Sequence, residues 1–181
     1  MGSHLAQDAG GHTSSTEDVR DARTGAARKR LRECEDQQDA CEAIREIVSN
    51  LLGCEEMALF QLERDHWRFP LIWSFGIEQK AVQLSKLLRG SALADVIAGQ
   101  AHISESSGQT GIAGKGEKAR AFVPIQFDGR TAAVLVLLRL LPQKAKIDEL
   151  DRELFAVISR EAGKGLFGGL PGSTGRSERK R

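Results

Sequence analysis

The stretch from Arg120 to Arg139 is the sequence feature that most constrains the fold. Ala121 to Phe127 and Thr131 to Leu138 are two apolar, β-prone runs, and Asp128-Gly129 lies between them. Asp-Gly is favoured in tight hairpin turns because both residues tolerate a positive φ. The second run is apolar at nearly every position, as in a strand that is buried on both faces. The sequence therefore predicts a β-hairpin whose second strand is central in a sheet.

The segments around this hairpin supply further strands and helices that could cover the sheet. Amphipathic periodicity predicts helices, and glycines or prolines mark their ends. The expected elements, in order, are a helix over residues 26–52, strands over 57–63 and 69–75 that form a hairpin, short helices over 78–88 and 92–98, a very short strand at 101–103, the central hairpin, and a helix over 149–167.

The chain is expected to form one domain with two flanking segments. Residues 1–25 are predicted to be disordered or partly helical and begin with MGSH, which resembles an expression tag; the domain covers 26–167, and 168–181 form a basic, disordered tail. The glycine-rich stretch 104–118 does not match a phosphate-binding loop. A flexible loop is the favoured interpretation of that stretch, and a lid over a ligand is the alternative.

Composition and residue spacing argue against several classes of function. The net charge of +1 gives no electrostatic case for nucleic acid, and no apolar run is long enough to cross a membrane. No catalytic constellation and no metal-ligand spacing is visible, so we do not expect an enzyme or a metal site. His102, in the predicted short strand, has no acidic or cysteine partner that is evident from the sequence.

The cysteines Cys34, Cys41 and Cys54 are odd in number and lie in the first third of the chain. This is a poor disulfide framework, so a reducing cytoplasm is expected. Cys34 and Cys41 are seven positions apart, which places them on one face of the predicted helix about 10 Å from each other. They are interpreted as small core or interface residues, and a redox sensor or a disulfide across a dimer is the alternative.

Three stretches together resemble a GAF domain, a sensory module related to PAS domains. They are GCEEMALFQLERDHWRFPLIWSFG, GSALADVIAGQAHIS, and the central hairpin followed by KIDELDRELFAVISREAGKGL. The resemblance implies an α+β fold with a central antiparallel sheet, the terminal helices on one face, and short helices with a flexible loop on the other. It also implies a sensory or regulatory domain of a bacterial-type signalling protein. The family's cyclic-nucleotide motif and its reductase and bilin-attaching cysteines are absent, so the ligand and any cofactor stay unidentified.

In such a fold the side covered by short helices and the loop is the expected pocket. The candidate pocket residues are Trp73, Phe75, His102, Glu105, Arg120 and Phe122, with Pro124 beside them. Related sensors dimerise through terminal helices, which implies a homodimer. The candidate interface residues are Leu31, Cys34, Cys41, Ile44 and Val48.

Three functions are compatible with these features. The first is a non-catalytic domain that binds a small ligand and regulates a signalling partner or output domain. The second is a protein-interaction or dimerisation module with a filled, vestigial pocket. The third, and least favoured, is an enzyme on the same scaffold, which would show a perturbed titratable pair in a cleft.

Overall fold

The computed structural model of the protein describes residues 14–63, 68–77, 84, 88, 90–104 and 119–169. Its helices and strands follow the predicted order with one exception, at the first helix. They are α1 (Ser14–Arg32), α2 (Gln37–Leu51), β1 (Cys54–Gln61), β2 (Leu71–Phe75), α4 (Ser91–Ile97), β3 (His102–Ile103), β4 (Ala121–Phe127), β5 (Arg130–Leu140) and α5 (Glu149–Phe167).

The five strands form one antiparallel sheet with β5 at its centre. The strand order is β2-β1-β5-β4-β3. Residues 131–138 of β5 are all buried, which confirms the prediction of a strand covered on both faces. In the turn between β4 and β5, Asp128 has φ of 50° and Gly129 has φ of 71°. Two successive positive φ values are the backbone that Asp-Gly was expected to adopt.

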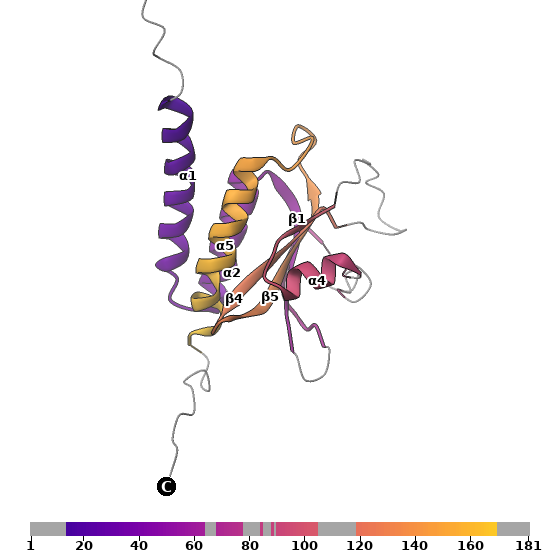
Figure 1. Ribbon diagram of the computed structural model, residues 1–181. Helices are drawn as coiled ribbons and strands as arrows, with labels where there is room; N and C mark the ends of the chain where they lie inside the picture. The colour runs from indigo at the N-terminus through magenta and orange to yellow at the C-terminus, as the bar shows by residue number, and fades with distance from the viewer. Residues whose placement is uncertain are drawn as a thin grey trace, which may run out of the picture.

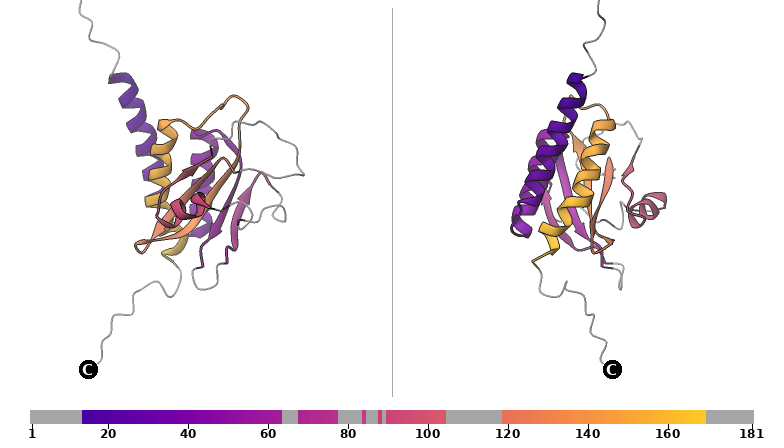
Figure 2. Two further views of the ribbon diagram at one scale, coloured as in Figure 1. Left: turned by 45° about the vertical axis from the view of Figure 1, so that its right-hand side comes forward. Right: turned by 60° about the vertical axis from the view of Figure 1, so that its left-hand side comes forward.

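The sheet separates two layers of helices, as Figure 1 and the edge-on view in Figure 2 show. On one side, the helix face, α1, α2 and α5 cover a large core that includes Met57, Leu59 and Leu135. On the other side, the α4 face, a smaller cluster forms around Phe60, Phe122 and buried residues of α4. This arrangement confirms the α+β fold class with terminal helices on one face and a short helix on the other.

The predicted single helix over residues 26–52 is wrong, because two helices occupy that region. Residues 33–36 interrupt the helix, and the Asp36 side chain caps α2 by accepting a 2.8 Å hydrogen bond from the Asp39 backbone N–H. Cys34 therefore lies between the helices and Cys41 lies within α2. The two cysteines do not share one helical stripe. α1 itself is continuous across residue 25, which was the expected edge of the domain.

α1 lies alongside α5 and runs in the same direction, and its first turns extend past the start of α5 (Figure 1). Ala27 and Leu31 are the buried apolar residues of α1. Ion pairs also connect α1 to α5. Arg20 pairs with Glu153 at 3.0 Å. Glu161 accepts two hydrogen bonds from the Arg32 guanidinium, at 2.9 Å and 3.0 Å. The attachment of α1 thus combines a small apolar contact with ion pairs to α5.

Glu161→Gln is expected to lower the free energy of unfolding by at most about 1 kcal/mol at pH 7, because it removes a bidentate ion pair whose carboxylate is 20% exposed but whose Arg32 side chain is 63% exposed. The hydrogen bond from Arg32 holds the pKa of Glu161 below its ordinary value of 4.5. The stabilisation is therefore present above pH 4.5 and is lost as the pH falls through the lower pKa of the folded state. Urea unfolding at pH 7 and pH 3 measures both effects.

A matched control for this variant is Glu33→Gln. Glu33 and Lys29 form an exposed i,i+4 pair at 3.9 Å, so its loss is expected to change stability little at either pH. If Glu161→Gln and Glu33→Gln behaved alike at pH 7, the ion pairs between α1 and α5 would not contribute to the attachment of α1.

Several predictions fall outside the described residues or on their edge. The predicted helix over 78–88 and most of the glycine-rich stretch 104–118 lie outside them, although Leu84 and Leu88 are described and buried on the α4 face. Among the helices that are described, none combines the length and the hydropathy that a membrane span requires.

Candidate functional site

α4 is held against the sheet by side chains from β4 and β5. The Thr131 hydroxyl donates a 2.9 Å hydrogen bond to the Val96 carbonyl, and the Gln126 amide donates to the Thr131 oxygen at 3.0 Å. Thr131 is 3% exposed, so this connection is shielded from water. The chain then turns at Gly99, where φ is 81°, and returns along the sheet as β3. This turn brings the residues that follow α4 close to those within it.

His102 and Asp95 form a polar pair at this turn. His102 Nδ1 lies 2.8 Å from Asp95 Oδ2, and the imidazole ring lies 6.2 Å from the Phe122 ring. Both His102 and Asp95 are partly exposed. The acidic partner of His102 is not evident from the sequence, because the pairing depends on how the chain reverses after α4. The Ala-Gly-Gln turn between α4 and β3 is the sequence signal that could have indicated it.

The other residues predicted for this pocket lie in several places. Phe122 pairs with His102 across the strands and is buried in the α4-face cluster. Arg120 directly precedes β4, where its carbonyl accepts a hydrogen bond from the Ser104 N–H at 3.0 Å. The structure thus brings His102, Phe122 and the Arg120 backbone to one end of the β3–β4 pair. Glu105 lies outside the described residues.

Trp73 and Phe75 lie on the opposite side of the sheet from α4. Trp73 pairs with Leu59 and Phe75 pairs with Met57, and both partners belong to the helix-face core. The two rings are stacked with centroids 6.3 Å apart, and the Arg45 guanidinium of α2 lies 5.4 Å from the centre of Phe75. The expectation that Trp73 and Phe75 line one pocket with His102 is therefore corrected. The pairing register and an extra residue in β2, Ile72, which lies between the partners of Leu59 and Phe60, decide the face, and the sequence does not reveal either.

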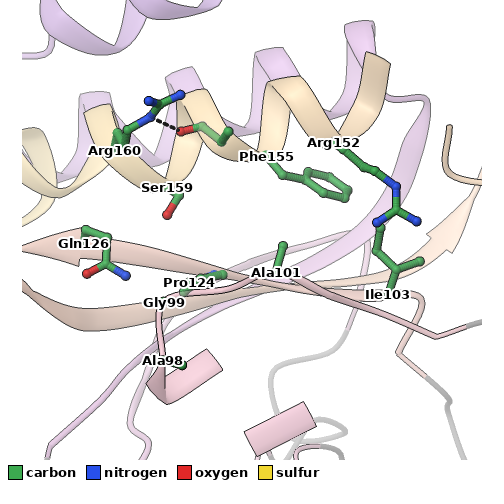
Figure 3. A pocket seen from close by; sticks show the side chains of 11 residues that line it. Ala98, Gly99, Ala101, Ile103, Pro124, Gln126, Arg152, Phe155, Ser159 and Arg160 are labelled. Atoms are coloured by element: carbon green, nitrogen blue, oxygen red, sulfur yellow. Dashed lines mark hydrogen bonds between the residues drawn. The ribbon is translucent and has the colours of Figure 1, made fainter. Parts of the chain in front are cut away.

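A groove of about 570 Å³ lies elsewhere, between α5 and the segment that joins α4 to β3 (Figure 3). Of the residues that line it, the sequence analysis named only Pro124. A stripe of α5 residues with helical spacing is the signal that could have revealed one wall. The lining residues are Ala98, Gly99, Ala101, Ile103, Pro124, Gln126, Arg152, Phe155, Ala156, Ser159 and Arg160.

The residues predicted for a dimer interface are mostly covered within one chain. Four of them are at most 4% exposed and pack in the helix-face core, and Cys34 is partly buried against it. A side chain that is buried within its own chain offers little surface to a partner, and the homodimer itself stays a prediction. The four buried residues are Leu31, Cys41, Ile44 and Val48.

The cysteines are poor candidates for thiolate chemistry. Burial raises the pKa of the Cys41 and Cys54 thiols to about 11 each. Burial also raises the pKa of Cys34 above its ordinary value. A protonated thiol is a weak nucleophile and a weak metal ligand, so the redox interpretation loses support. Within the described part of the chain, no group of three or more His, Cys, Asp or Glu residues is placed to hold a metal ion.

No protein-family model matches the sequence, and no curated protein matches it. Solved structures do match the fold. A GAF domain of a phosphoenolpyruvate-protein phosphotransferase from Coxiella burnetii is 15% identical with a TM-score of 0.54, covering 76% of this chain and 86% of that one. The corresponding Acinetobacter GAF domain is 16% identical with a TM-score of 0.50, covering 78% and 93%.

A methyl-accepting chemotaxis protein fragment, residues 122 to 287, is also similar in structure. It is 14% identical with a TM-score of 0.53, and the match covers 80% of this chain and 96% of that chain. At these identities the similarity concerns the fold. The sheet order, the layer of terminal helices and these matches together show that the chain has a GAF-like fold.

Proposed function

We propose that this chain is a regulatory domain that binds a small ligand on its α4 face and has no catalytic activity of its own. The observation that carries the proposal is the His102–Asp95 pair beside Phe122, at the place where α4 meets β3. A polar pair next to an apolar cluster offers both hydrogen bonding and apolar contact to a ligand. The similar structures, which include domains of a phosphotransferase and of a chemotaxis protein, support a signalling context.

The way α4 is attached supports a response to a ligand. α4 has seven residues and no side-chain cap at its N-terminus. Within the described residues, Thr131 and His102 provide the side-chain hydrogen bonds between α4 and the rest of the protein. The opposite face is closed by three longer helices. A ligand that contacts His102 would therefore shift or order α4 more readily than the helix face.

A non-catalytic role is supported by the surroundings of His102. Within the part of the chain that the structure describes, no hydroxyl or thiol is hydrogen-bonded to His102. An activated nucleophile needs such a contact with its base. The arrangement therefore supports ligand binding rather than nucleophilic catalysis. The cytoplasmic location stays a prediction from the sequence.

Native mass spectrometry of the purified protein under reducing conditions tests the proposal. We expect a small molecule bound to the wild type and lost from His102→Leu, which keeps an apolar contact with Phe122 but removes the polar pair. Arg45→Ala, on the opposite side of the sheet, is the control and is expected to retain the molecule. A molecule that both variants retain equally would place its site away from His102.

A second candidate function is a dimerisation module, and the exposure of Val19 on α1 favours it. Val19 is 55% exposed on a helix whose first turns extend past α5. A homodimer through the terminal helices would use this side of α1. Light scattering after size-exclusion chromatography is then expected to show a dimer that Val19→Asp converts to a monomer. A monomeric wild type at high concentration would rule this candidate out.

A further inference from the structure

The groove beside α5 is separate from the His102–Asp95 pair, although both use the segment that follows α4. One wall is formed by α5, and the other by residues 98–103 and β4 (Figure 3). Its centre is apolar. Phe155 projects from α5 toward the β4 side, where Pro124 lies, and Ala101 and Ile103 lie across the groove from it. Phe155 is 1% exposed and Pro124 is buried, so the apolar surface left for a ligand is mainly that of Ala101 and Ile103.

Two arginines occupy the ends of the α5 wall. Arg152 lies near Ile103, and Arg160 lies toward the Gln126 end, with Ser159 between them pointing toward β4 (Figure 3). They are eight residues apart, which corresponds to about 12 Å along the helix axis. The Arg160 Nε–H donates to the Ala156 carbonyl at 3.0 Å, which orients its guanidinium.

The charges of α5 are divided between its two sides. On the side toward α1, Glu153 pairs with Arg20 and Glu161 pairs with Arg32. Asp151 is buried and pairs with Lys144. The groove side has two arginines and no acidic residue in its lining. The Glu149 carboxylate, 3.7 Å from Arg152, is exposed and offsets that charge only weakly.

We propose that this groove is a second binding site, for a small organic anion that has an apolar body and terminal carboxylates. The apolar body lies along Ala101, Ile103 and Ala156, which keep exposed surface in the groove. The carboxylates are bound at the ends of the groove by Arg152 and Arg160, in charge-assisted hydrogen bonds. The two arginines select an anion, because the exposed Glu149 offsets Arg152 only weakly and no acidic residue lines the groove. The apolar surface between the arginines selects a body of moderate length over a compact inorganic ion.

The position of the site links two parts of the molecule. Ala98 and Gly99 follow α4 directly, and Arg152, Phe155 and Arg160 belong to α5. An anion in the groove therefore contacts both the segment that leaves α4 and the terminal helix. It would hold them together without occupying the position of His102.

Isothermal titration calorimetry with decanedioate is the test. This probe has an apolar chain with a carboxylate at each end, and decane-1,10-diol is the uncharged analogue. We expect decanedioate to bind with one site per chain and the diol not to bind detectably. Amide NMR shifts caused by decanedioate should be concentrated at Gly99, Ala101 and Ile103. The affinity should also fall as the salt concentration rises.

Substitutions in the groove distinguish the contribution of its arginines to binding from the contribution of its shape. Arg152→Ala/Arg160→Ala is expected to weaken decanedioate binding by about tenfold or more, because both charge-assisted contacts are lost. Ala101→Trp fills the groove without changing its charge and should abolish binding. Arg28→Ala removes an arginine on the α1 side, where Arg32 still pairs with Glu161, and should change the affinity by less than about twofold.

Three results would overturn the proposal. The diol binding as tightly as decanedioate would mean that charge does not select the ligand. Equal binding by the double arginine variant would place the anion elsewhere, and no binding at millimolar decanedioate would rule out this ligand class. None of these results bears on the ligand of the α4 face, because His102→Leu leaves the groove intact and the groove variants leave His102 in place.

Discussion

Gly163→Ala is expected to lower the free energy of unfolding by about 2–3 kcal/mol, although alanine is the better helix former. Gly163 lies in α5 where the helix crosses β4. A Cβ atom at this position would come within 2.0 Å of the Gln126 carbonyl oxygen and 3.0 Å of its carbon. These are backbone atoms of a strand that is hydrogen-bonded into the sheet, so they cannot move aside as a flexible side chain would. Urea unfolding followed by circular dichroism measures the loss.

Gly25→Ala in α1 is the matched control, because it makes the same chemical change in another helix. In the described part of the chain, no atom lies within 4 Å of a Cβ built at Gly25, so the helix preference of alanine decides the effect. The free energy of unfolding is expected to rise by about 0.5–1 kcal/mol. If the two substitutions changed stability in the same direction, the close approach of α5 to β4 would not be a constraint of this fold.

Lys144→Met is expected to destabilise the protein by about 2–3 kcal/mol, because it leaves a buried carboxylate without its cation. Asp151 is 1% exposed, and the Lys144 ammonium lies 2.7 Å from its Oδ2 atom. Its other oxygen, Oδ1, has no hydrogen-bond partner among the residues that the structure describes. Lys144 is 23% exposed, so water can partly replace it and the expected loss is below that of a fully buried pair. Thermal and urea unfolding at pH 7 measure the change.

The double variant Lys144→Met/Asp151→Leu distinguishes the cost of an unpaired Asp151 carboxylate from the cost of losing the packing of the Lys144 side chain. It removes the unpaired charge, so it should recover part of the stability that Lys144→Met loses. The recovery is incomplete, since Asp151 also accepts a 2.9 Å hydrogen bond from the Asp148 N–H in the capping box of α5. Lys146→Met is the exposed control and should be close to neutral. A double variant less stable than Lys144→Met would show that the ion pair is not the dominant contribution of Asp151.

The elements that could be predicted from the sequence are those whose pattern is local. The central hairpin depends on two apolar runs and an Asp-Gly turn, and α5 begins and ends at the predicted residues. The break at residues 33–36 was missed because it interrupts a helical pattern that continues on both sides. The Asp36 cap marks the start of α2, but an acidic residue inside a charged helix is not distinctive.

The candidate sites were harder to predict, because they depend on contacts between distant segments. His102 was recognised as a candidate, but its pairing with Asp95 requires the reversal at Gly99. Trp73 and Phe75 were placed on the wrong face, since their orientation follows from the pairing of β2 with β1. The groove brings α5 to a segment about 50 residues earlier in the chain, so no local pattern could indicate both walls.

Local sequence patterns were sufficient to predict the α+β class, the central hairpin, the amphipathic final helix and the GAF-like order of elements. These features arise from short-range periodicity and turn chemistry, which act within a few residues. The tertiary structure decided which faces the aromatic residues occupy, which acidic residues neutralise which arginines, and where a groove remains between α5 and β4. The physical reason is that pairing register, helix packing and ion pairing depend on the distance between residues in space, and the folded sheet sets that distance.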